Sequence, residues 1–169
     1  MPIPGIKQPE LIAVDDGLRL RKFDGNYDLA LPWYQDSETL LLVDGADKPY
    51  TPERIRQMYD YLAAHGELYW IEVRTGEGFI PIGDVTFWQE DMPIVIGVRA
   101  YRGQGIGGKV VAALCRRARE VDYNKIYVNE IYDFNEGSRR CFERQGFVMY
   151  EKTERGARYV LRLKEDGDA

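Results

Sequence analysis

Short runs of alternating apolar and polar residues dominate the first hundred positions, and this period predicts β-strands. The runs LIAV and LRLRKF flank the turn signal Asp15-Asp16-Gly17, so we predict a hairpin near the start of the chain. Three further β-type runs, LYWIEVR, FIPIGDVTFW and PIVIGV, lie between residues 67 and 98, separated by TGEG and QEDM. Such short separations predict antiparallel connections between neighbouring strands.

A helical period interrupts this pattern once. Thr51 is a good N-cap, and Pro52 and Glu53 after it suit the first turn of a helix. Apolar residues repeat at helical spacing from Ile55 to Leu62, so we predict a helix that ends near residue 65. The mixed pattern of residues 26–43 predicts only an irregular helix.

In the second half of the chain the pattern predicts helices alternating with strands. A glycine-rich stretch at 103–108 precedes apolar residues at helical spacing, and the next β-type run is KIYVNEIY. Strand, glycine loop, helix and strand together predict a βαβ crossover. A short helix carrying Ser138 and Phe142 should end at Gly146, and FVMYEK should then pair with ARYVLRL.

Composition restricts the class of protein. A chain of 169 residues that is 44% hydrophobic suits one domain, residues 1–169. The net charge of -5 and the scattered Lys and Arg argue against a nucleic-acid partner. No apolar run approaches the roughly 18 residues of a membrane span, so we expect a soluble cytoplasmic protein. Cys115 and Cys141 should be free thiols, and no metal site is expected.

The stretch YRGQGIGGK, residues 101–109, is the most informative in the chain. Glycines at the mouth of a helix let a ligand approach the backbone, and the unpaired N–H groups there favour an anion such as a pyrophosphate. Gly103, Gly105 and Gly108 also satisfy the dinucleotide fingerprint, with Glu130 as the ribose-binding acid. Only 39 residues follow Glu130, too few for the further βαβ units of that fold. The position of Lys109 excludes a P-loop.

Two separated motifs resemble the GNAT acyltransferase superfamily. Its signature R/Q-x-x-G-x-G/A stands here as Arg102-Gly-Gln-Gly105-Ile-Gly107, and a second motif runs from Asn135 to Gly146-Phe147. The match is best over about residues 92–150, and flanking segments look like the ribosomal-protein, spermidine and aminoglycoside acetyltransferase branch. The resemblance implies an α+β fold with a mixed, mostly antiparallel twisted sheet, helices on both faces and a splayed parallel strand pair.

The resemblance also implies acetyl-CoA as cofactor and assigns residues to it. The backbones of Ile96 and Val98 would bond the pantetheine arm. Asn135 matches a cofactor contact, although a helix N-cap is a sufficient physical role. The implied cofactor-binding set is Ile96, Gly97, Val98, Arg102, Gly103, Gln104, Gly105, Ile106, Gly107, Gly108, Lys109, Asn135, Ser138 and Phe142.

Glu130 is the candidate catalytic residue. It lies on the predicted strand 125–132, and in peptide-acetylating members of the family a glutamate five residues before the motif asparagine is the general base. A structural ion pair is the other interpretation, and Asp84 and Glu72 are alternative bases. Phe142 departs from the tyrosine that commonly protonates the leaving thiolate, because phenylalanine has no proton to donate. Tyr132 or water would then take that role.

These residues predict an N-acetyltransferase in which a primary amine of a small molecule or peptide attacks acetyl-CoA directly. The alternative is a noncatalytic acyl-CoA sensor or interaction module, which the departure at Phe142 motivates. Acidic residues such as Asp36, Glu38 and Asp91 would suit a cationic acceptor. A homodimer is left open.

Overall fold

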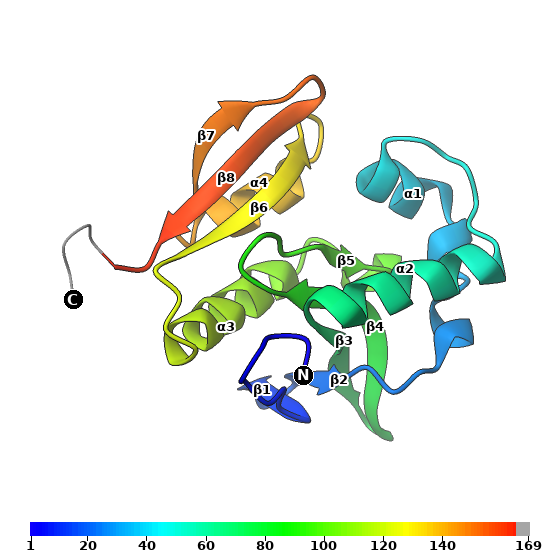
Figure 1. The fold of residues 1–169 in the computed structure, drawn as a ribbon. Helices are drawn as coiled ribbons and strands as arrows, with labels where there is room; N and C mark the ends of the chain where they lie inside the picture. Colours follow the sequence, from blue (N-terminus) through cyan, green and yellow to red (C-terminus); the bar gives the residue numbers. More distant parts are fainter. Residues whose placement is uncertain (165–169) are drawn as a thin grey trace.

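A computed structural model describes residues 1–164, so the last five residues of the predicted domain lie outside it. Figure 1 shows two β-sheets connected through a long helix. The elements are β1 (Leu11–Asp15), β2 (Leu18–Lys22), α1 (Ser37–Asp44), α2 (Pro52–His65), β3 (Glu67–Thr75), β4 (Gly78–Phe87), β5 (Ile94–Ile96), α3 (Ile106–Glu120), β6 (Lys125–Tyr132), α4 (Glu136–Glu143), β7 (Val148–Lys152) and β8 (Gly156–Arg162). The described residues contain no helix with the length and apolar character needed to cross a membrane.

The first sheet has the order β1-β2-β3-β4-β5, and every neighbouring pair is antiparallel. The hairpin predicted around Asp15 is confirmed, as is the antiparallel run between residues 67 and 98. Ile82 is an extra residue in β4, because Ile71 pairs with Gly83 while the next residue of β3 pairs with Pro81. The carbonyl of Ile82 accepts the N–H groups of both Gly97 and Val98, which fixes the end of β5.

The second sheet has the order β6-β8-β7 and is also antiparallel. The predicted pairing of the last two strands around Gly156 is therefore confirmed. β6 has a register shift between Val128 and Ile131, so Asn129 and Glu130 lie on a bulge. The alternation that was expected to run through Glu130 is broken at that point.

Helix α3 connects the two sheets as the predicted crossover. The Tyr127 N–H bonds the Gln89 carbonyl, and the Asn129 N–H bonds the Asp91 carboxylate, so these two segments advance in the same direction. Beyond them β5 pairs with β4 and β6 pairs with β8, and the described strands form no ladder between β5 and β6. The expected parallel pair is thus splayed so far that the expected single mixed sheet is two antiparallel sheets.

Side chains alternate between two cores on opposite faces of β3. Tyr69 and Ile71 belong to a core that packs against α3 and the second sheet, whereas Leu68 and Trp70 belong to a core beneath α2. Helices therefore cover both faces of the first sheet, as predicted. Segment 26–43, for which only irregular helix was expected, contains two short 3-10 turns, Tyr27–Ala30 and Trp33–Gln35, followed by α1.

Strand β7 forms one edge of the second sheet and leaves three apolar side chains exposed, Val148, Met149 and Tyr150.

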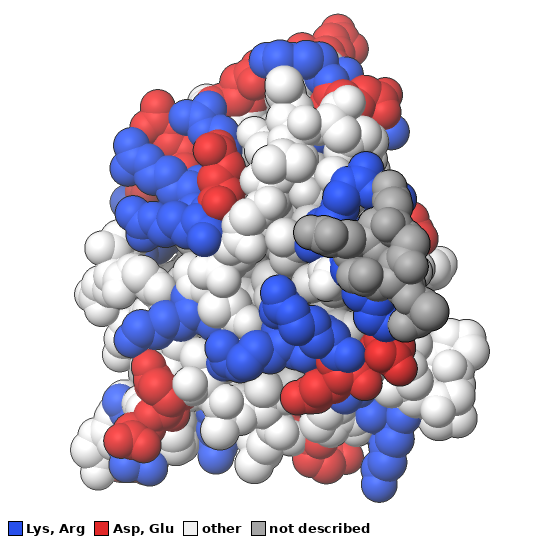
Figure 2. Space-filling model, turned by 90° about the vertical axis from the view of Figure 1, so that its left-hand side faces the viewer, with Lys and Arg blue, Asp and Glu red and all other residues white. Residues whose placement is uncertain are grey.

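Figure 2 shows the face that lies on the left of Figure 1. Basic side chains on this face are interrupted by acidic and uncharged ones.

Candidate active site

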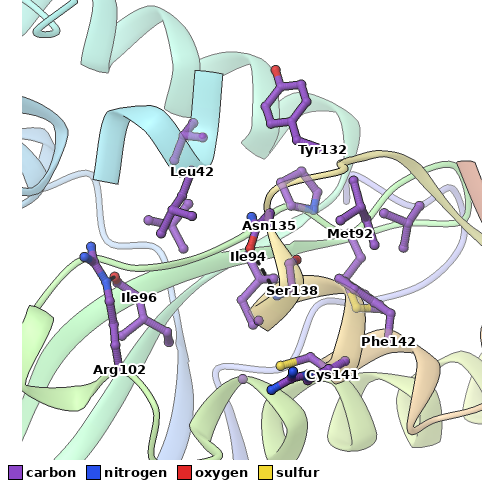
Figure 3. Close-up of a pocket in the computed structure, with 18 of the residues that line it drawn as sticks. Leu42, Met92, Ile94, Ile96, Arg102, Tyr132, Asn135, Ser138, Cys141 and Phe142 are labelled. Carbon is purple, nitrogen blue, oxygen red and sulfur yellow. Dashed lines mark hydrogen bonds between the residues drawn. The ribbon is translucent and has the colours of Figure 1, made fainter. Parts of the chain in front are cut away.

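A cavity of about 610 Å³ lies where β5 and β6 diverge, between α1 on one side and α3 and α4 on the other. Figure 3 shows Leu42 of α1 and Cys141 of α4 at opposite sides, with Ile94 and Ile96 of β5 between them. The cavity brings together ten of the residues singled out from the sequence, namely Ile96, Arg102, Gly103, Gly105, Ile106, Gly107, Glu130, Asn135, Ser138 and Phe142.

The N-terminus of α3 borders this cavity and lacks the cap and the acidic residue that the other described α-helices have. Helices α1, α2 and α4 each have a side-chain cap and an acidic residue in the first turn. Among the α-helices of residues 1–164, only α3 begins without either, and its N-cap is Gly105. The Lys109 N–H is bonded to the Gly105 carbonyl, so the N–H groups before it have no intrahelical acceptor. Free donors at the positive end of a helix favour an anion.

The glycines ahead of α3 give the loop its shape. Gly103 has φ 73° and Gly105 has φ 78°, a region that side-chain-bearing residues rarely adopt. Gly107 is helical, and a Cβ there would lie 3.0 Å from the Cys141 sulfur, close to the cavity wall. The loop therefore presents backbone rather than side chains to the cavity.

Strand β5 directs alternate backbone groups into the gap. Across the β4–β5 ladder the Gly97 N–H donates to the Ile82 carbonyl, and the Thr86 N–H donates to the Pro93 carbonyl. Val95 lies midway between Pro93 and Gly97, so its backbone groups also point at β4. The backbones of Ile94 and Ile96 then face away from β4, toward the gap. The Ile96 carbonyl accepts from the Arg102 Nε at 2.9 Å, and the Val98 N–H donates to Ile82 at 3.2 Å. The resemblance assigned the backbones of Ile96 and Val98 to pantetheine. The Ile96 carbonyl and the Val98 N–H already have protein partners, whereas the Ile96 N–H faces the gap.

Five predicted cofactor residues do not line the cavity, namely Gly97, Val98, Gln104, Gly108 and Lys109. Gly97 lies against the Trp33 ring, which a Cβ would overlap. The Gln104 amide donates to the Ala100 carbonyl at 2.6 Å, and Lys109 pairs with Asp15 at 3.0 Å. The side chains of these two polar residues are thus directed to the protein in this structure.

Arg102 lines the cavity but connects the loop to α1. Besides bonding Ile96, its guanidinium donates to the Thr39 hydroxyl and lies 3.2 Å from Glu38. Arg99 adds a pair with Asp36 at 2.8 Å. The Arg102 side chain thus holds α1 over β5, a role that the motif alone did not indicate.

Asn135 and Phe142 enter the cavity from α4. The Asn135 side chain accepts the Ser138 N–H at 3.1 Å, so it caps this helix and lines the cavity at once. Phe142 is 1% exposed and packs edge-on against Phe147, with ring centroids 5.2 Å apart. The buried ring has no proton-donating group.

Glu130 lies exposed on the β6 bulge and lines the cavity. Within residues 1–164 its carboxylate has no hydrogen bond or ion pair, so the ion-pair interpretation lacks a partner there. Tyr132 lines the cavity two residues later, and partial burial raises the pKa of its phenol. A free carboxylate and a phenol therefore lie together at this end of β6.

The two alternative bases lie elsewhere. Glu72 is 2% exposed and binds Arg19 and Arg21 at 2.8 Å each, so it is a structural ion-pair residue. Asp84 is also 2% exposed, does not line the cavity, and accepts hydrogen bonds from Tyr34 and Tyr59 at 2.8 Å each. Burial raises the Asp84 pKa to about 6, although the two tyrosine hydrogen bonds oppose the shift.

Sequence reasoning did not single out several cavity residues. Leu42 and Val43 come from α1, whose boundaries the sequence left undetermined, and Met92 lies on the loop before β5. Arg140 and Arg144 come from α4 and its C-cap, where their position within the second motif was the available signal. Within residues 1–164 no group of three or more His, Cys, Asp or Glu side chains could hold a metal ion.

The model of the acetyltransferase (GNAT) family matches residues 27–147, most of the chain. The chain belongs to this family. It is therefore a GNAT-type N-acetyltransferase that uses acetyl-CoA. Comparison with curated proteins finds no match.

Solved structures share the GNAT fold. A GNAT acetyltransferase from Bacillus anthracis superposes with a TM-score of 0.73 at 16% identity, covering 90% of this chain and 98% of that one. An acetyltransferase from Salmonella typhimurium that modifies the N-terminal serine of a 50S ribosomal protein gives 0.68 at 17%, covering 92% and 100%. An aminoglycoside acetyltransferase in complex with coenzyme A and kanamycin gives 0.69 at 18%, covering 86% and 95%.

Proposed function

We propose that this GNAT enzyme transfers the acetyl group of acetyl-CoA to a primary amine by direct attack within the cavity between β5 and β6. The observation that carries the proposal is the uncapped, acid-free N-terminus of α3 opening into that cavity. The similar aminoglycoside acetyltransferase was solved with coenzyme A and an amine acceptor bound together, which supports a ternary complex.

The phosphates would bind at the α3 end. The N–H groups from Gly105 to Gly107 supply donors without acceptors, and the helix dipole favours negative charge there. Arg144 lines the same cavity and, within residues 1–164, has no carboxylate partner, whereas Arg140 is paired with Glu136 at 3.5 Å. Arg144 is thus the unpaired cation best suited to contact a cofactor phosphate.

The pantetheine arm would lie in the gap between the strands. Ile94 and Ile96 direct backbone N–H groups into it, and such fixed donors can polarise a carbonyl oxygen. When bound, acetyl-CoA supplies the acetyl group as a thioester. Transfer to the amine forms a C–N bond and breaks the C–S bond, with the amine losing a proton and coenzyme A leaving as a thiol.

We assign Glu130 as the base that accepts the proton of the attacking amine. Its carboxylate lines the cavity and carries no competing hydrogen bond in the described chain, so both oxygens are available to accept a proton. Because Phe142 cannot protonate the departing thiolate, the Tyr132 phenol or a water molecule takes that role. Thiolate is a fair leaving group near neutral pH, given a thiol reference pKa of about 8.5, so a weak acid suffices.

The test is turnover. The purified protein is mixed with acetyl-CoA and a panel of amines, thiol release is followed, and the acetylated amine is identified by its mass. We expect thiol release in proportion to N-acetylated product. Binding of acetyl-CoA without product across the panel would reject the proposal and favour the acyl-CoA sensor.

A further inference from the structure

The cavity has a second end, away from the phosphate loop. We define this acceptor end by five of the lining residues, Leu42 and Val43 of α1, Val95 of β5, and Glu130 and Tyr132 of β6. Figure 3 shows Leu42 and Tyr132 on the side of the cavity opposite Cys141, which lies against Gly107 in the first turn of α3. We propose that the acceptor end takes an amine with one positive charge and an apolar substituent, and discriminates against polycations. The inference rests on the proposed function, which names an amine acceptor without its class.

The carboxylates around α1 are already neutralised. Asp36 binds Arg99 at 2.8 Å, and Glu38 lies 3.3 Å from Arg99 and 3.2 Å from Arg102. Asp44 at the other end of α1 pairs with Arg54 at 3.3 Å. The acidic residues that suggested a cationic acceptor from sequence therefore hold α1 in place.

Asp91 also lines the cavity, but one of its two carboxylate oxygens is held by the backbone. This oxygen accepts the backbone N–H groups of Met92 and Asn129, each at 2.9 Å, and so supports the bulge of β6. Within residues 1–164, Glu130 is the cavity carboxylate whose two oxygens both lack a protein partner, so it is the group best placed to bind one ammonium group.

An exposed cation, Arg155, lies beside this end. The Arg155 guanidinium donates to the Gly45 carbonyl at 3.1 Å and to the Asp44 carbonyl at 3.5 Å. The same group lies 4.8 Å from the centre of the Tyr132 ring. Arg155 therefore connects the β7–β8 turn to the C-terminus of α1, and its charge disfavours a second or third ammonium group nearby.

The rest of the acceptor end is apolar. Leu42, Val43 and Val95 are half-buried, so each exposes part of an aliphatic side chain to the cavity. Figure 3 shows Leu42 directed from α1 toward Ile94 and Ile96 of β5. Such a wall gains by covering an apolar substituent and offers a polyhydroxylated or polycationic acceptor few partners.

The experiment compares kcat/KM for 2-phenylethylamine with kcat/KM for spermidine and for kanamycin, by thiol release at saturating acetyl-CoA. We expect 2-phenylethylamine to be favoured by at least tenfold. A higher kcat/KM for spermidine or kanamycin would overturn the inference and leave the proposed function standing. Absence of acetylation with every amine, despite acetyl-CoA binding, would reject the proposed function and this inference with it.

Two variants test whether the acceptor end sets this preference among amines. Leu42→Glu places a carboxylate in the acceptor end and should move the spermidine to phenylethylamine ratio toward spermidine by about tenfold. Leu41→Glu is the matched control, because Leu41 is the preceding residue of α1, is 46% exposed and does not line the cavity. It should leave the ratio within about twofold. Equal shifts in both folded variants would show a general charge effect and overturn the placement.

Discussion

Glu130, Asp84 and Glu72 carry the same acidic group in three environments. Glu72 is neutralised by two arginines, Asp84 is sealed beneath two tyrosine hydroxyls, and Glu130 is free beside the cavity. The sequence placed all three on strands and favoured Glu130 from its position before the motif asparagine. It could not show how Glu72 and Asp84 are engaged, because their partners Arg19, Tyr34 and Tyr59 come from distant segments. Environment rather than residue type therefore supports Glu130 as the proposed base.

Glu130→Gln should lower kcat by about 100-fold, the lower end of general-base contributions. The loss should be largest at low pH, where more of the amine is protonated, while acetyl-CoA affinity changes little. Steady-state rates from pH 6 to 9 measure this. Glu143→Gln, an exposed acid of α4 outside the cavity, is the control. Wild-type rates for Glu130→Gln at every pH would leave Glu130 without a catalytic role.

Asp84→Asn should change how stability depends on pH. The folded-state pKa of about 6 lies above the ordinary 3.8, so the folded protein holds a proton that the unfolded chain releases between pH 4 and 6. Stability therefore falls as pH rises through that window, by on the order of 2 kcal/mol. Urea unfolding at pH 4 and pH 7 should show this extra loss in the wild type and not in Asp84→Asn. Identical losses of stability in the wild type and in Asp84→Asn would contradict the raised pKa of Asp84.

Phe142→Tyr should raise kcat by at most about tenfold, or about 1.4 kcal/mol of barrier. The reason is that the thiolate already leaves readily, so proton donation is not the hardest step. Steady-state kinetics at saturating substrates decide this. If the natural protein were inert and Phe142→Tyr active, phenylalanine would mark a binding protein instead of an enzyme.

At the scale of elements, features that depend on the local sequence were predicted well, and features that depend on long-range strand pairing were not. The cap at Thr51 and the strand KIYVNEIY were placed correctly, because capping and alternation are local. The bulge at Asn129 and Glu130 and the division into two sheets depend on β8 and Asp91, which the local pattern does not contain. Segment 26–43 mixes 3-10 turns with α1 and has no single period.

Helix α4 allows two roles of Asn135 to be separated. Asn135→Ala removes the cap and should lower the free energy of unfolding by about 1 kcal/mol. Asn135→Asp keeps a good cap, so stability should hold, but adds negative charge to the cavity and should weaken acetyl-CoA binding severalfold. Thermal unfolding and calorimetric titration measure the two effects. Unchanged affinity in Asn135→Asp would leave Asn135 a cap alone.

At the scale of the whole molecule, the site exists only because segments distant in sequence meet. The second motif on α4 faces the glycine loop of α3, while Arg99 and Arg102 hold α1 against β5. The loop proposed to bind phosphate could be located from the sequence, because its signature is local to residues 102–107. The acceptor end could not, since α1 and the Arg155 turn are 110 residues apart.

The central claim is that the N-terminus of α3 holds the phosphates of acetyl-CoA, and calorimetric titration tests it most directly. Gly107→Val places a side chain against the cavity wall, whereas Gly108→Val changes the neighbouring helical residue, which does not line the cavity and whose Cβ would meet no other group within 4 Å. We predict that acetyl-CoA binds the wild type and Gly108→Val alike and binds Gly107→Val at least tenfold more weakly. Equal affinity for all three folded proteins would contradict the claim.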